Sequence, residues 1–444
     1  TLLTTLTEYL PYLITISHGL SGKPLETFPG TSEEIEITLR SELETEWRPT
    51  ISSSSLSLKS RQSTSRIRGR GIDFELAFVL TTLGYTLSHL ARSAFLPTFY
   101  AANTPSADQR TAAVQTACKY LLQASAVHSL LASSSAFADV ARSVGPGGTA
   151  RVPDLDPAAQ AGLSSLALAE ATLIAVWKDD AFIAACIQAR NPNDKEWMVR
   201  APEIPKVRAL LFARLCVRAA EYAEQSAAGL GSVGGQGSAG VDDDLVKYTR
   251  VLGRVARARA CRFFGTDAEL AGKVGEGIAW LRAAKGVLGL RNTDAGGKEE
   301  SSSKGGLSKL KRGWAERREE RKMEKDSGSR GKEKGELGPG DNAGREEESR
   351  VIEMLEGKWE RMNNTINTQP IPPSTDLLTN LPSGRDIHSP PGPYKIPCLD
   401  EQQLVRMRAP PEEDDFRPGS DVEDSEEELN TPGAFPERTE SAYY

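Results

Sequence analysis

One stretch, residues 158–228, constrains the fold more than any other part of this chain. It contains two long apolar segments rich in alanine, LSSLALAEATLIAVWKDD and IPKVRALLFARLCVRAAEYAEQ, separated by a loop that contains prolines. Small side chains allow two helices to approach closely, and each segment is long enough for a helix of about 20 residues. We therefore expect a packed helical hairpin at the centre of the fold. The small residues at its contact are expected to be Ala167, Ala169, Ala171 and Ala213.

The remainder of the apolar part also shows helical periodicity. The segment 74–92 is apolar on nearly all sides, which is typical of a helix in the middle of a protein. Gln109 follows Ser106 by three residues, a capping-box pattern that predicts a helix beginning near Ser106. The acidic residues 242–244 predict the start of a further helix, because negative charge is favourable at a helix N-terminus. No alternating run of β-branched residues predicts a strand. Further helices are predicted over 2–20, with a break at Pro11, and over 31–47, with Thr31 and Glu34 as its capping box. Two more are predicted to start at Thr266 and to span 346–363. Residues 52–70 and most of 133–157 are predicted to be loops.

The composition changes after Leu290. Before it the chain is rich in Ala and Leu, whereas 298–345 interleaves basic and acidic residues with few apolar ones. Such a segment buries too little apolar surface to offset the entropy of ordering it. We therefore expect one all-α domain over 1–400, with 298–345 as a disordered charged insertion and a Pro-rich extended stretch over 366–398. Residues 401–444 are predicted to be an acidic disordered tail.

Charge and cysteine usage narrow the class of protein. The formal net charge of −7 does not favour nucleic-acid binding, which usually requires a basic surface. The five cysteines are widely spaced without a C-x-x-C pair, which is typical of buried free thiols in a reducing compartment. No apolar run reaches the length of about 18 residues that a membrane span needs, and the start lacks the basic region of a signal peptide. We therefore expect a cytoplasmic protein.

The residue types that usually carry chemistry form no catalytic pattern. The four histidines stand in no nucleophile-and-base context, and His89 and His128 lie in apolar helices, which favours hydrogen-bonded core positions. Closely spaced Cys/His pairs for zinc are absent from the sequence. The glycine cluster 272–277 lacks the strand before it that a phosphate loop needs, so we expect close helix packing there. We predict no enzymatic activity, no cofactor and no metal, with a hydrolase of unrecognised site as the alternative.

Two charged segments carry weaker signals. In 304–334 the interleaved acids cancel most of the positive field, which favours a solvated linker over contact with an anionic lipid or nucleic acid. In the tail, Ser420 and Ser425 each have a glutamate three residues on. That spacing is the pattern of acid-directed kinases, so both serines are candidate phosphorylation sites.

Several of these segments also carry a family resemblance. LALAEATLIAVWKDD with VRALLFARLCVRAAEYAEQ, and GEGIAWL at 275–281, resemble the two signatures of Bro domains, the boomerang-shaped helical domains of the Alix family. Gly277 and Trp280 depart from the commoner residues of the second signature. EWRPTIS, GRGIDFELAFVLTTLGYTLSHLAR and PCLDEQQLVRMRAPPEEDD are similar to the fungal PalC branch, the pH-response regulators. The resemblance covers 1–400 outside the charged insertion and implies stacked helical hairpins like those of TPR proteins.

The resemblance implies a non-catalytic adaptor in the response to ambient alkaline pH. Bro domains bind the C-terminal amphipathic helix of the ESCRT-III filament subunit on an apolar patch of their concave face. Carried over to this sequence, the patch would comprise Leu173 and Ile174 on the first helix of the hairpin and Leu211, Phe212 and Leu215 on the second. Spacing alone favours the core for each of them. Neighbours on a helix point about 100° apart, so we expect at most one of Leu173 and Ile174 to be fully buried.

The same resemblance implies further partners and a location. Other proteins of the pH-signalling pathway would be recruited with it to endosomes or to cortical sites of the plasma membrane, and membrane association would come through partners. No nucleic acid is expected among the partners. The alternative within the same fold class is a TPR-like helical scaffold in endosomal sorting that binds a different protein.

Overall fold

The computed structural model describes residues 1–27, 31–33, 35–52, 66–101, 103–143, 152–188, 204, 206–234, 240–290, 342–389 and 391–407. Long helices dominate these residues, and four short strands accompany them. The helices are α1 (Leu2–Ser21), α2 (Ile72–Phe99), α3 (Ala107–Ser133), α4 (Ser135–Ser143), α5 (Pro157–Trp177), α6 (Ala181–Gln188), α8 (Lys206–Ser232), α9 (Asp243–Leu270), α10 (Val274–Leu288), α12 (Arg345–Met362), α13 (Ser374–Thr379) and α14 (Glu401–Met407), with a 3-10 turn η1 (Pro153–Leu155) and a π turn η2 (Asn363–Asn367). The strands are β1 (Leu25–Thr27), β2 (Thr31–Glu33), β3 (Glu44–Trp47) and β4 (Ile67–Arg70).

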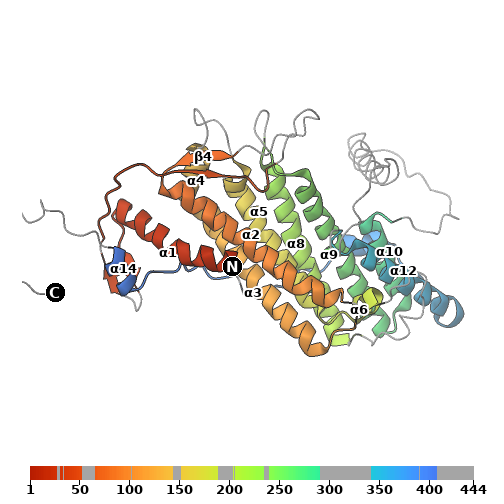
Figure 1. Ribbon diagram of the computed structural model, residues 1–444. Coiled ribbons are helices and arrows are strands. Elements are labelled where there is room, and N and C mark those ends of the chain that lie inside the picture. The colour runs from red at the N-terminus through yellow and green to blue at the C-terminus, as the bar shows by residue number, and fades with distance from the viewer. Residues whose placement is uncertain are drawn as a thin grey trace, which may run out of the picture.

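The long helices pack one after another along the chain. α2 packs against α3, α3 against α5, α5 against α8, α8 against α9, and α9 against α10, while α12 packs against α10. Figure 1 shows them as an elongated array with α1 at one end and α12 at the other. Neighbours in sequence are therefore neighbours in space, as in stacked helical hairpins. The prediction of an all-α fold is confirmed.

One continuous core runs through this array. Its buried apolar side chains extend from Leu6 on α1 to Trp359 on α12. A smaller cluster adjoins it and is made by Ile51, Ala159, Leu163, Leu230, Val241 and Val246. Beside that cluster the buried Asp154 accepts hydrogen bonds from the Thr50 amide at 2.7 Å and the Ser52 hydroxyl at 3.0 Å. A polar side chain thereby ties the loop after β3 to the start of α5.

α5 and α8 form the central hairpin that the sequence predicts. All four alanines expected at its contact are buried, and at its far end Gly229 lies against Gly162, where a Cβ on Gly229 would come within 3.2 Å of the Gly162 Cα. Large side chains would hold the two backbones apart at that point. α5 is also long and apolar enough to cross a membrane, with a mean hydropathy of 1.4. It lies between α3 and α8, and 56% of its most apolar window is buried, as expected for a core helix.

Several local predictions are also confirmed. Ser106 and Gln109 make both hydrogen bonds of a capping box at the start of α3, and Asp242 caps α9. At the α9–α10 contact, a Cβ on Gly277 would lie 3.1 Å from the Gly265 carbonyl oxygen, so this glycine does permit close helix packing. The turn between the two helices falls at Gly272, whose φ of 76° suits glycine. It comes later than predicted, because Thr266 continues α9 rather than starting a new helix.

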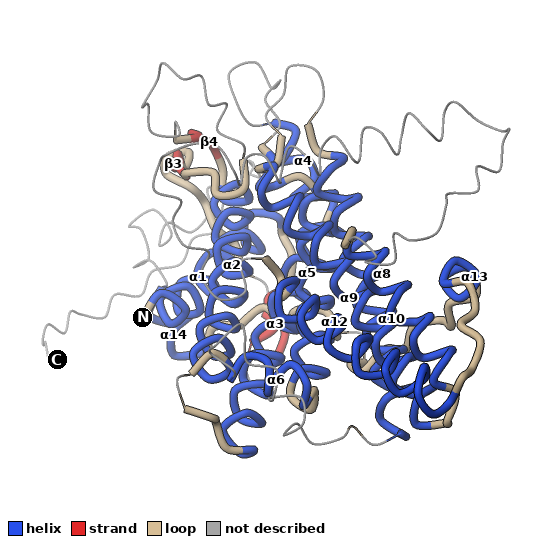
Figure 2. Tube along the Cα trace, turned by 90° about the vertical axis from the view of Figure 1, so that its right-hand side faces the viewer, coloured by secondary structure: helices blue, strands red, loops and turns tan. Residues whose placement is uncertain are grey.

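The predicted helix over 31–47 is wrong. The chain instead forms β2, an irregular stretch and β3, which pairs antiparallel with β4 inside a segment predicted as a loop. Trp47 explains the outcome: its indole Nε1 donates to Glu75 at 2.6 Å, and its ring stacks on Phe78 of α2 at 5.6 Å. The apolar stripe of the predicted helix has no such partner, since Leu39 remains 44% exposed. Contacts with α2 therefore override local propensity, and Figure 2 shows β3 and β4 at one edge of the helices.

α1 is continuous, although a break at Pro11 is predicted. Leu10 and Leu13 beside the proline are buried in the core. The Thr15 hydroxyl donates to the Pro11 carbonyl at 2.8 Å. Burial of the apolar stripe thus holds the turn from which proline removes one backbone hydrogen bond. α4 is a second difference, because it occupies part of the loop predicted over 133–157.

After α12 the chain returns along the array as an arm, defined here as residues 363–407. α13 packs against α10, and Figure 1 shows α14 beside α1, so the arm connects the two ends of the molecule. The prediction of a returning helix over 346–363 is confirmed by α12. The first residues of the predicted acidic tail form α14. Residues 298–341 of the predicted insertion and 408–444 of the tail, including Ser420 and Ser425, lie outside the described residues.

Candidate protein-binding face

The five apolar residues predicted to bind a partner divide into two groups. Leu173, Phe212 and Leu215 are at most 5% exposed and belong to the core. Ile174 and Leu211 are half-buried and pack against that core from its edge. α8 has α5 on one side and α9 on the other, and Phe212 meets Phe263 of α9 edge-on at 5.4 Å. The structure therefore leaves Ile174 and Leu211 as the members of the set with accessible surface.

The first turns of α8 add two apolar residues that sequence reasoning missed. Val207 is 85% exposed and Leu210 is 45% exposed. With Leu211 they form the α8 patch, defined as Val207, Leu210 and Leu211. The spacing of three and four residues that places them on one face was visible in the sequence. It could not reveal the patch, because α8 carries apolar residues on several faces and only packing decides which are covered.

The ends of α5 and α8 are joined beside the patch. Arg208 of α8 pairs with Asp179 at 3.4 Å in the turn after α5, so the two helices run antiparallel and Ile174 lies at the same end of the hairpin as the α8 patch. Phe182 on α6 is half-buried at this end as well. Both charged side chains of the pair are partly exposed, so it positions the turn and adds little stability.

The arm crosses the same face of α8 one turn beyond the patch. Arg214 donates to the Ser383 carbonyl at 3.1 Å, and the Arg385 amide donates to the Arg214 carbonyl at 3.1 Å. Asp386 accepts hydrogen bonds from Arg218 at 2.8 Å and from the Tyr222 hydroxyl at 2.7 Å. We call this set of contacts the clasp. It bounds the α8 patch with polar groups, and Val207 and Leu210 remain exposed beside it.

A buried ion cluster fixes the helices behind the patch. Arg262 of α9 contacts Asp180 and Glu348, each at 2.5 Å, and Arg259 contacts Glu348 at 2.8 Å. All four side chains are at most 2% exposed. Burial alone would raise the pKa of Glu348, but the two guanidinium groups outweigh it and lower that pKa. Two positive and two negative charges therefore tie α9 and α12 to the turn after α5.

His128 occupies the core position that the sequence favours for it, whereas the same prediction for His89 is wrong, because His89 is exposed on α2. His128 is 1% exposed, and its Nδ1 lies 2.6 Å from Gln160 Oε1. The Gln160 amide nitrogen donates to the Asp154 carbonyl, so its oxygen is the acceptor and His128 Nδ1 carries the proton. Burial lowers the pKa of His128 to about 4, although the bond to Gln160 opposes this. The imidazole is therefore neutral and held in the interior.

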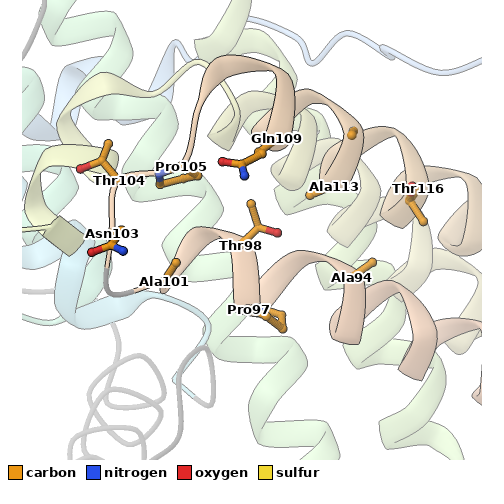
Figure 3. Close-up of a pocket in the computed structure, with 11 residues that line it drawn as sticks. Ala94, Pro97, Thr98, Ala101, Asn103, Thr104, Pro105, Gln109, Ala113 and Thr116 are labelled. Carbon is orange, nitrogen blue, oxygen red and sulfur yellow. The ribbon is translucent and has the colours of Figure 1, made fainter.

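A cavity of about 570 Å³ lies between the end of α2 and the start of α3. Figure 3 shows that short side chains surround it, among them Ala94, Pro97, Thr98 and Ala113. Its polar groups are threonine, asparagine and glutamine, which supply neither an acid nor a base. Among the described residues, no cluster of three His, Cys, Asp or Glu side chains has the geometry to hold a metal ion.

Comparison with known proteins places the fold in a family. The chain matches the model of the BRO1-like domain over residues 34–383 and belongs to that family. It is 62% identical over 455 residues to the pH-response regulator protein palC of Emericella nidulans, a match that covers 100% of this chain and 88% of the relative. The palC protein of Cryptococcus neoformans is 30% identical over 172 residues, which is 36% of this chain and 30% of that protein. The resemblance to PalC-type Bro-domain proteins is confirmed.

A solved structure shows the same fold at low identity. The crystal structure of ALIX in complex with the SIVmac239 PYKEVTEDL late domain superposes with a TM-score of 0.51 and 14% identity. The match covers 90% of this chain and 42% of the ALIX chain, so this chain spans less than half of that protein. The likeness supports the all-α Bro architecture.

Proposed function

We propose that this protein is a non-catalytic adaptor of the ambient alkaline-pH response that binds the C-terminal amphipathic helix of an ESCRT-III filament subunit. Identity of 62% along the whole chain to a palC pH-response regulator supports the pathway. The observation that carries the binding mode is the α8 patch, where Val207 and Leu210 expose apolar surface on a rigid helix. Uncovered apolar residues that adjoin one another favour a protein-binding role.

The chemistry of the patch favours a helical ligand with acidic flanks. An amphipathic helix places apolar side chains three and four residues apart, which matches the spacing of Val207, Leu210 and Leu211. Arg208 and Arg214 border these residues. Acidic side chains at the edge of the ligand would find complementary charge there, which increases the association rate and fixes the orientation. Ile174 extends the apolar surface onto α5.

Binding would recruit the protein to membranes through its partner. The ESCRT-III subunit assembles on membranes, so an adaptor that holds its terminal helix would gather other pH-signalling proteins at endosomes or cortical plasma-membrane sites. An elongated helical array suits this task, because it offers several separate faces to different partners. In this proposal the chain supplies positions for other proteins, and any catalytic step belongs to them.

A binding assay tests the patch directly. A fluorescent peptide of the ESCRT-III terminal helix is titrated with the full chain, with Leu210→Asp and with Leu211→Asp. A carboxylate in the apolar contact should weaken binding by about 2 kcal/mol, roughly thirtyfold in Kd. Leu39→Asp is the matched control, because Leu39 is 44% exposed and Leu210 is 45% exposed. The control should bind like the wild type.

Circular dichroism of each variant separates lost binding from lost folding. Leu215→Asp is unsuitable as a test, because Leu215 is 2% exposed and the substitution would unfold the hairpin. If the wild-type chain does not bind the peptide, the proposed function is wrong. If the wild type binds and both α8 variants bind equally well, the partner is correct and the site lies elsewhere.

A further inference from the structure

The arm contains a proline-rich stretch between two anchors. Residues 389–399 read SPPGPYKIPCL, with prolines at 390, 391, 393 and 397. Proline fixes its own φ and drives the preceding residue toward extended conformations. Among the described residues of this stretch, none makes a backbone-to-backbone hydrogen bond to a helix. The stretch therefore has the character of a polyproline II strand whose backbone is free for a partner.

Both ends of the stretch are fixed to the helical array. On one side the clasp holds Asp386 to α8. On the other, Leu399 is 2% exposed and Leu404 of α14 is buried. In between, residues 391–395 lie beside Leu122, Gln123 and Ala126 of α3. A strand held in place at both ends loses little further conformational entropy when a partner binds it.

Burial over residues 391–395 of the stretch repeats every third residue. Pro391, Tyr394 and Pro397 are half-buried, whereas Gly392, Lys395 and Cys398 are exposed. A polyproline II helix has three residues per turn, so each of these triplets forms one ridge. The first ridge rests on the helical array and the second faces solvent. On the third ridge Pro393 is exposed, whereas Ile396 and Leu399 further along it turn toward the array.

We propose that Gly392, Pro393 and Lys395 form a docking edge for an SH3-type domain. Such domains bind polyproline strands in an aromatic-lined groove. Residues 390–395 have the spacing Pro-x-x-Pro-x-Lys, in which the proline packs on aromatic rings and the cation meets a carboxylate of the groove. A groove contacts two ridges of the strand and leaves the third outside. Here that third ridge, with Pro391 and Tyr394, is the one turned toward the protein.

The same burial pattern argues against a WW domain. Recognition of a proline–tyrosine pair would require the Tyr394 ring. That ring is half-buried, and burial raises the pKa of its hydroxyl. A WW domain that binds the proline–tyrosine pair would not contact the exposed Lys395 ammonium group. An acidic SH3 groove would pair with it directly.

Titration calorimetry tests the docking edge. The intact protein is titrated with a set of recombinant SH3 domains that bind Pro-x-x-Pro-x-Lys/Arg peptides, and at least one should bind. Lys395→Glu should then weaken binding at least about tenfold, and Pro393→Ala should do the same. The matched controls are Lys358→Glu, an exposed lysine on α12, and Pro382→Ala, an exposed proline on the arm before the clasp. Both controls should keep the wild-type affinity.

Three outcomes would overturn the proposal. The first is that no SH3 domain binds the intact protein, even if a free peptide of residues 387–399 binds. The second is equal affinity for wild type and Lys395→Glu. The third is binding by a WW domain that is lost in Tyr394→Ala. Circular dichroism of every variant shows whether the fold is retained, and ESCRT-III peptide binding by the Lys395→Glu variant shows that the α8 patch is independent of the docking edge.

Discussion

Single buried polar residues determine how the stability of this helical core depends on pH. His128 is enclosed by α2, α3 and α5: Gly84 faces its ring so closely that a Cβ there would lie 2.5 Å from Nε2. The free energy of protonating the ring is therefore coupled to unfolding. Four of the five cysteines are buried in the same way, and burial raises the pKa of Cys118 and Cys186 to about 11. These thiols are small apolar core residues, as the sequence favours.

The pH dependence of stability should report His128. Its pKa is about 4 in the folded protein against 6.5 for an ordinary histidine, so the unfolded chain binds more protons between these values. Stability therefore falls as pH falls through that window, by up to about 1.4 kcal/mol per pH unit. Urea unfolding between about pH 7 and about pH 4.5 should show a shallower pH slope for His128→Gln than for wild type. The control variant His89→Gln, at an exposed position, should keep the wild-type dependence of unfolding free energy on pH. If all three proteins show the same dependence, His128 is not the group responsible.

At the scale of elements, a helix that returns from far along the sequence completes the array. α12 inserts Glu348 between Arg259 and Arg262, and Lys285 of α10 contacts Glu356 of the same helix at 2.7 Å. Each of these charges is buried and is tolerable only because its partner is present. Docking of α12 is therefore coupled to the position of α9 and of the turn after α5, behind the α8 patch.

Removing the central charge should undo this coupling. Glu348→Gln keeps the side-chain shape but leaves two buried guanidinium groups with one carboxylate, and should lower the free energy of unfolding by about 3–5 kcal/mol. Glu353→Gln, at an exposed position of the same helix, should cost less than about 0.5 kcal/mol. Chemical denaturation measures both values. Equal stability of the two variants would show that the cluster does not hold α12.

At the scale of the whole molecule, the chain leaves and re-enters the array at one place. Arg345 at the start of α12 donates to the Leu288 carbonyl near the end of α10 at 2.8 Å. The two helices also pack against each other along their lengths. The described helices on either side of residues 291–341 are therefore in direct contact with each other. That 1–400 forms one domain stays a prediction.

Excising the charged segment tests that prediction. Replacing 291–341 with a flexible linker of about eight residues should leave the helical spectrum of the array unchanged. The shorter loop should raise the free energy of unfolding by about 1–2 kcal/mol, because loop-closure entropy grows with the logarithm of length. Urea denaturation measures the change. Loss of a single cooperative transition would show that the segment belongs to the folded domain.

Interactions between near neighbours in sequence were predictable from the residues themselves. The capping box of Ser106 and Gln109 and the cap at Asp242 depend on spacing alone, and the structure contains both; the alanines of α5 and α8 are buried as predicted. The segment 31–47 has helical spacing too, yet its fate depended on Trp47 meeting α2, a contact that local propensity does not encode. The ion cluster of Asp180, Arg259, Arg262 and Glu348 was likewise invisible, since its members come together only in three dimensions.

The sequence by itself determined that this protein is a stack of helical hairpins centred on α5 and α8, because helix periodicity and small-residue spacing are local properties. Tertiary structure alone decided which faces of that hairpin are covered. Leu215 went to the core because α5 and α9 enclose α8, whereas Leu210, on another face of the same helix, is 45% exposed among the described residues. Burial is a property of the neighbours on every side, and a single helix does not carry that information.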